Sequence, residues 1–133
     1  MTYRLTPFGK HSPAVTTIIV EAARCWREAC DSRKSTQPRL FATLSRRDCG
    51  MLAPVFDSLM ALYEAALGRR LSVGRAALLS EDEMLLLGLL NGSKRTRACL
   101  NCGESAATAF NCALCSTRIM MGLAIGPATA SRG

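Results

Sequence analysis

The chain has 133 residues, a length that leaves room for one domain and hardly for two. Hydrophobic residues make up 49% of it and aromatic residues only 5%, so a buried core has to rest on aliphatic side chains, which favours helices over sheets. The net charge is +7, with nine Lys/Arg against four Asp/Glu in residues 1–48, three against five in 49–93, and five against one in 94–133.

Two basic ends therefore flank an acidic middle, a pattern typical either of a protein with an anionic partner or of a solvated surface. No export signal is visible and no uninterrupted apolar run is long enough to cross a bilayer, so we expect a cytoplasmic protein with no membrane partner. In that compartment the seven cysteines are not expected to form disulfides.

The first predicted helix covers residues 13–30. Ser12 suits the N-cap, and Pro13 suits the first helical position. Apolar residues then recur at steps of three and four, as on one face of an amphipathic helix: Val15, Ile18, Ile19, Ala22, Ala23 and Trp26. Residues 31–39 are polar and basic, and we assign them to a loop.

A second helix is predicted over residues 52–67, where apolar residues again follow the helical period. Gly68 suits its C-terminal end, because glycine readily adopts the left-handed conformation found there. Its start is open. A capping box from Ser45 to Asp48 would place Pro54 inside the helix and kink it, so a start near Pro54 costs less.

The third predicted helix covers residues 80–91. Ser80 and Glu83 have the spacing of a capping box, and the acidic run Glu81-Asp82-Glu83 is better explained as a helix start than as a catalytic pair of carboxylates. The following residues are apolar nearly all round, so we expect this helix to be central and buried.

A fourth helix near residues 113–125 completes the prediction of a mainly α fold, a small helical bundle with a C-terminal zinc-knuckle-like segment. We expect a single domain over 1–133. Its predicted parts are a helical core at 13–92, a Cys-rich segment with the final helix at 93–125, and flexible ends at 1–12 and 126–133.

Four of the cysteines form two Cys-x-x-Cys pairs: Cys99 with Cys102, and Cys112 with Cys115. Zinc favours four soft donors in a tetrahedron, so this spacing predicts one Zn²⁺ held as four thiolates. The segment resembles the short zinc-ribbon modules, in which two such pairs hold one zinc ion and the first pair is followed by a glycine, here Gly103. Four thiolates leave no open coordination position, so the predicted zinc is structural.

The residues between the two pairs favour a different interpretation. Residues 104–111 lack a central glycine or proline, and their alanines favour a helix over the hairpin of a ribbon. The alternative is therefore that the four cysteines are small packing residues on helices, with redox use of one pair as a third option. Because few large apolar residues lie between 91 and 118, we expect a metal ion to order that stretch.

Basic residues gather between 33 and 47 and in a strip just before the first cysteine pair. If nucleic acid or an acidic protein surface binds, these are the candidate contacts, and on nucleic acid they would bind phosphates without sequence preference. They are Arg33, Lys34, Arg39, Arg46, Arg47, Lys94, Arg95 and Arg97. A helix-turn-helix over 51–91 is disfavoured, because its second helix would approach phosphates with its acidic end.

Catalytic motifs are scarce. His11 is the only histidine, and the chain has no phosphate-binding glycine loop, no His-Glu-x-x-His and no Gly-x-Ser-x-Gly. We therefore expect a small zinc-stabilised helical protein that binds a macromolecule in a regulatory or accessory role. The alternative is a metal-free helical module for protein–protein interaction, or a subunit of a complex.

Overall fold

Six α-helices and one 3-10 turn follow one another along residues 13–125, which are the residues that the computed structural model describes. They are α1 (Pro13–Asp31), α2 (Thr36–Ser45), η1 (Gly50–Leu52), α3 (Ala53–Leu67), α4 (Glu81–Leu90), α5 (Thr96–Cys99) and α6 (Glu104–Ala124). Within that range no residue lies in a strand, and one isolated bridge joins Arg75 to Leu78. The prediction of a mainly helical protein is confirmed.

The predicted helices at 13–30, 52–67 and 80–91 correspond to α1, α3 and α4. Helix α3 begins at Ala53 with Pro54 in its first turn, which agrees with the cheaper of the two predicted starts. Gly68 ends it in the left-handed conformation, with φ of 73°. The predicted flexible ends, 1–12 and 126–133, lie outside the described residues.

Two sequence assignments are wrong. Residues 36–39, assigned to a loop, form the first turn of α2, which buries only Leu40 and Leu44 and so shows too short a periodic pattern to be recognised. The fourth helix begins at Glu104 rather than near 113, because the alanine-rich stretch between the cysteine pairs is helical.

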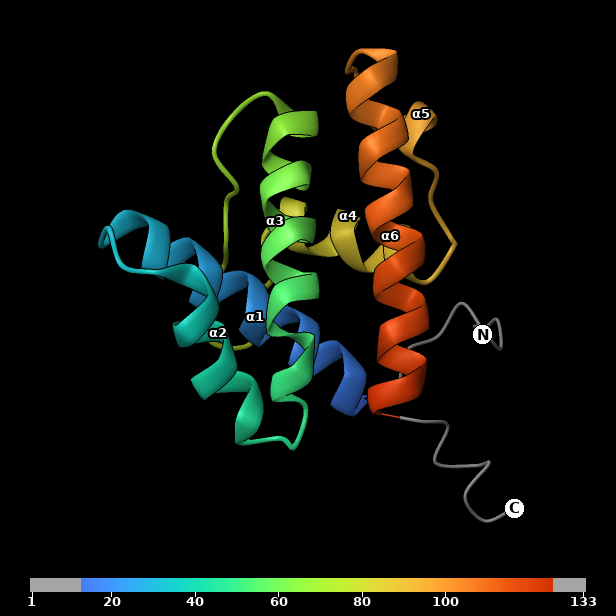
Figure 1. Cartoon of the computed structure of the whole chain (residues 1–133). Helices are drawn as coiled ribbons and strands as arrows, with labels where there is room; N and C mark the ends of the chain where they lie inside the picture. Colours follow the sequence, from blue (N-terminus) through green and yellow to red (C-terminus); the bar gives the residue numbers. More distant parts are fainter. Residues whose placement is uncertain (1–12, 126–133) are drawn as a thin grey trace.

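Helices α3 and α6 lie side by side at the centre of the fold and run in opposite directions (Figure 1). The rings of Tyr63 and Phe110 stack between them with centroids 5.2 Å apart and an interplanar angle of 8°. Helix α1 crosses beside α3, α2 packs against both of them, and α4 packs against α1 and α6. Phe110 and Leu114 of α6 thus belong to the same hydrophobic core as Trp26 of α1.

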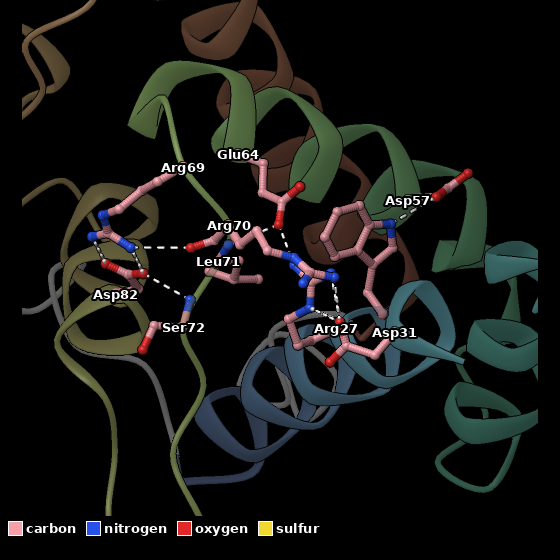
Figure 2. Close-up of polar contacts among 10 residues, drawn as sticks. Arg27, Asp31, Asp57, Glu64, Arg69, Arg70, Leu71, Ser72 and Asp82 are labelled. Carbon is pink, nitrogen blue, oxygen red and sulfur yellow. Dashed lines mark hydrogen bonds and ion pairs between the residues drawn. The ribbon is translucent and has the colours of Figure 1, made fainter. Parts of the chain in front are cut away.

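Residues 68–80 join α3 to α4 without a helix or strand, and carboxylates on the two flanking helices accept their backbone N–H groups (Figure 2). The N–H of Leu71 donates to Glu64 at 2.7 Å, and the N–H of Ser72 donates to Asp82 at 2.8 Å. Buried backbone donors need partners, so these carboxylates determine the path of the connection.

Each of these carboxylates also has an arginine partner. The buried Arg27 of helix α1 pairs with Glu64 of helix α3 (Figure 2). Arg69 binds both carboxylate oxygens of Asp82 at 2.7 and 2.8 Å. Burial raises the pKa of Asp82, but the hydrogen bonds from Arg69 and from the Ser72 N–H outweigh it and hold that pKa below its ordinary value.

The stretch Gly50–Leu67 is long and apolar enough to cross a membrane by length and composition alone. This stretch is not predicted as a membrane span from the sequence, because Asp57 and Glu64 interrupt its apolar residues. Phe56, Leu59 and Tyr63 in this stretch are fully buried in the protein, so core packing accounts for part of its apolar composition.

Candidate functional site

The four cysteines predicted to bind zinc lie on different parts of the fold. Cys99 is the last residue of α5, Cys102 lies in the connection to α6, and Cys112 and Cys115 lie in the middle of α6. Cys102 is half-buried, whereas Cys99, Cys112 and Cys115 are exposed.

The continuity of α6 determines this arrangement. At 1.5 Å per residue, Cys112 lies about 12 Å along the helix axis from Glu104, where α6 begins. Four zinc ligands need sulfurs about 2.3 Å from one ion. Among residues 13–125, no three His, Cys, Asp or Glu side chains are grouped so that they could hold a metal ion. The structure does not bring the two pairs together, and zinc binding stays a prediction.

The alternative, that the four cysteines only pack, is wrong for the three exposed ones. The large apolar side chains of this region fill the core instead: Leu100, Phe110 and Leu114 are buried. The stretch for which a metal staple was expected therefore contributes buried apolar side chains to the core. Packing does describe Cys49, which is buried in the core, and Cys30, which is half-buried against it. Burial raises the pKa of both thiols, so they are poor nucleophiles at neutral pH.

The solvent side of α6 carries no charge after its first residue. The charged residues of this helix are Glu104, at its first position, and Arg118, which is half-buried. We call the remaining exposed residues the α6 face: Ser105, Thr108, Asn111, Cys112, Cys115, Ser116, Ile119, Gly122 and Leu123. Ile119 is 63% exposed and Leu123 is 74% exposed, one turn apart on the same side.

The uncharged surface continues onto α3. A shallow hollow of about 410 Å³ lies between the two helices, and none of the residues that line it is charged. On α3 they are Pro54, Val55, Ser58 and Leu62, and on α6 they are Ala109, Cys112, Ala113, Ser116 and Thr117. Cys112 thus lies both on the α6 face and at the edge of this hollow.

A second hollow, of about 650 Å³, lies where α4, α5 and α6 meet. Lys94, Arg95 and Arg118 line it, and no acidic residue does. Arg118 is already engaged, since its guanidinium donates to the carbonyls of Leu89 and Leu90, both at 2.8 Å, at the end of α4. Lys94 and Arg95 are exposed and form no ion pair within the described part of the chain.

The other predicted basic contacts lie elsewhere. Arg33 and Lys34 lie in the turn after α1, and Arg46 follows α2; these three are exposed. Arg39 and Arg47 have acidic partners within the protein, Glu28 at 3.9 Å and Glu21 at 2.8 Å.

The side chain of Arg97 lies outside the described residues. Helix α2 and α5 lie on opposite sides of the α3–α6 pair (Figure 1), so the predicted basic residues do not form one surface.

Sequence reasoning does not predict the buried charges. Arg27, Asp82 and Glu83 are nearly inaccessible to solvent. The capping box of Ser80 and Glu83 is present as predicted, but Glu83 also accepts from Arg24 at 2.8 Å and from the backbone N–H of Gly74 at 3.1 Å. All of these groups are paired within the protein, so we assign them a structural role. His11, the remaining catalytic candidate, lies outside the described residues.

No protein-family model matches the chain, and no curated protein or solved structure is detectably similar to it.

Proposed function

We propose that this protein is a helical protein–protein interaction module that binds its partner through the α6 face. The observation that carries the proposal is the absence of charge along the exposed side of α6, from Ser105 to Leu123. An uncharged face with exposed large apolar side chains, here Ile119 and Leu123, is a candidate binding site, and burial of an exposed leucine contributes about 1.5–3 kcal/mol.

The spacing of the apolar residues suits recognition by another helix or by a groove. Ile119 and Leu123 are four residues apart on α6, and Cys112 and Cys115 continue the same side by two further turns. Steps of three and four are how a helix presents anchors to a partner. The adjoining hollow with α3 widens the uncharged area beyond a single helix.

A module without a zinc ion bound by all four cysteines of one chain has the stronger support. The zinc-stabilised form expected from the sequence needs Cys99 and Cys102 beside Cys112 and Cys115, whereas α6 is helical from Glu104 onward. The core residues of α6 already attach it to α3.

The proposal is tested with a photo-crosslinking amino acid placed at Leu123 in cells that make the protein. We expect irradiation to give a discrete cross-linked species, because the partner covers that side chain. Leu78 is the matched control, since it is 78% exposed but lies in the α3–α4 connection, away from the α6 face. Absence of an adduct at Leu123, or equal adducts at both positions, contradicts the proposal.

A second candidate function is the binding of an acidic macromolecule at the hollow lined by Lys94 and Arg95. We expect a single-stranded oligonucleotide to bind weakly at low salt, and the affinity to fall steeply as salt rises, because counterions are released on binding. Reversing both charges, Lys94→Glu with Arg95→Glu, should abolish the gel shift, whereas the same reversal at Arg33 and Lys34 should leave most of it. The absence of any complex at low salt removes this candidate.

A further inference from the structure

We propose that the α6 face binds a second copy of this chain, and that Cys112 and Cys115 of the two copies together hold one Zn²⁺ as four thiolates. The proposal rests on the interaction function assigned to the α6 face and names its partner. It assigns no metal role to Cys99 or Cys102.

The α6 face has the spacing of a coiled-coil seam. Exposed residues alternate at steps of three and four along the helix: Ser105, Thr108, Cys112, Cys115, Ile119 and Gly122. This alternation is the heptad pattern by which two helices pack. All but Ile119 are small, so two helix axes can approach closely.

The seam is also complementary to itself in the antiparallel sense. Its midpoint falls between Cys112 and Cys115, so a two-fold axis there places Cys112 opposite Cys115 of the partner subunit. The same axis places Thr108 opposite Ile119 of the partner subunit and Ser105 opposite Gly122 of the partner subunit. In each of these two pairs a smaller side chain meets a larger one. An interface between identical copies requires such self-complementarity.

Charge favours the same direction. Glu104 and Arg118 are the charged residues of α6. In a parallel pair the two Glu104 residues would lie at the same end of the seam, whereas in the antiparallel pair they lie at opposite ends, each on the same flank as Arg118 of the partner subunit. The antiparallel arrangement therefore avoids repulsion between like charges.

The two cysteines form half of a zinc site. Residues three apart on a helix are neighbours, with Cβ atoms about 5–6 Å apart, so two flexible thiolates can reach one ion. Zinc in a structural site takes four donors, and one chain supplies only two here. The two-fold axis brings the second pair to the first. Within residues 13–125 of one chain, no third His, Cys, Asp or Glu side chain joins this pair to complete the site.

Arg118 provides the compensating charge. Its Nη1 lies 3.8 Å from Cys115 Sγ, while Nε and Nη2 are held by the carbonyls at the end of α4. Four thiolates around Zn²⁺ leave a net charge of −2, and one fixed guanidinium from each copy would balance it. On binding, each thiol loses its proton to solvent, and the zinc ion accepts a lone pair from each sulfur.

The experiment uses the full chain, reduced and stripped with a chelator, then titrated with zinc while its mass is followed by light scattering. We expect a monomer that becomes a dimer with one zinc bound per two chains, and cobalt in place of zinc should give the absorption of a tetrathiolate. The double variant Cys112→Ser with Cys115→Ser should lose both dimer and metal. The matched variant Cys99→Ser with Cys102→Ser should keep both.

One zinc per monomer, loss of metal in both double variants, or no zinc binding at all would each overturn the proposal. Failure here is distinguishable from failure of the interaction function. A cross-link from Leu123 to a different protein supports the module but excludes the second copy, whereas no cross-link at all contradicts the module itself.

Discussion

Replacing Phe110 with alanine is expected to destabilise the protein by about 3–5 kcal/mol, the usual cost of removing a large buried aromatic side chain. Phe110 is fully buried between α6 and α3 and stacks on Tyr63. The cavity left behind is enclosed by other fully buried core side chains, so it cannot easily collapse. Urea denaturation followed by circular dichroism measures the loss.

Two further variants test whether burial of Phe110, and packing in general, explains the expected loss of stability. Phe41→Ala removes the same side chain at an exposed position on α2 and should change stability by about 0.5 kcal/mol or less. Cys102→Ser tests whether a metal ion orders residues 94–118, as the sequence predicts, or whether packing does so. If Phe41→Ala costs as much as Phe110→Ala, or if Cys102→Ser unfolds this stretch, the packing explanation is wrong.

The elements that the sequence predicts best are those whose signals are local. Helix α4 has a complete capping box at Ser80 and Glu83, and α3 ends at a glycine that adopts the left-handed conformation. Helix α1 presents a long apolar stripe that begins directly after Pro13. Each of these signals acts within one or two turns, so no tertiary information is needed to recognise it.

Helices α2 and α6 show where local signals fail. Two buried leucines, Leu40 and Leu44, are enough to attach α2 to the core, but they give no detectable period among polar neighbours. In α6 the Cys-x-x-Cys pattern suggested a turn, although the alanines before Cys112 already favoured helix. The spacing of two cysteines is the same on a metal-binding turn as on a helix face, so spacing alone does not distinguish them.

The carboxylates that organise residues 68–80 could not be predicted either. Glu64, Asp82 and Glu83 are bound to arginines on α1 and in the connection itself, and Arg24 is 59 positions from Glu83 in the sequence. Such pairings depend on how the helices pack. The sequence identifies the acidic run after Ser80 as a helix start, and the capping box of Glu83 confirms this. The sequence does not reveal that Asp82 and Glu83 also bind arginines and backbone N–H groups of the connection.

Glu83→Gln is expected to cost about 2 kcal/mol at pH 7, because it removes the charge from a carboxylate that is bound to Arg24 and nearly inaccessible to solvent. Burial raises the pKa of Glu83, but the hydrogen bonds from Arg24 and from the N–H groups of Ser80 and Gly74 outweigh it, and the folded-state pKa lies below its ordinary value.

A lowered folded-state pKa fixes the sign of the pH dependence. The carboxylate stabilises the fold fully at pH values above the unfolded-state pKa of about 4.3, and this contribution disappears as the pH falls through the lower folded-state pKa. The free energies of unfolding of the parent and Glu83→Gln should therefore differ most at neutral pH and converge in acid. Chemical denaturation at a series of pH values from neutral to acid measures this difference.

Glu81→Gln is the matched control, since Glu81 occupies the same helical turn but is exposed and forms no ion pair within the described residues. It should change stability by about 0.5 kcal/mol or less at every pH. If the difference between the parent and Glu83→Gln stays constant from neutral pH into acid, the charge of Glu83 is not what stabilises the connection. The hydrogen bonds to Ser80 and Gly74, which a glutamine can also accept, would then be sufficient to hold residues 74–80 in place.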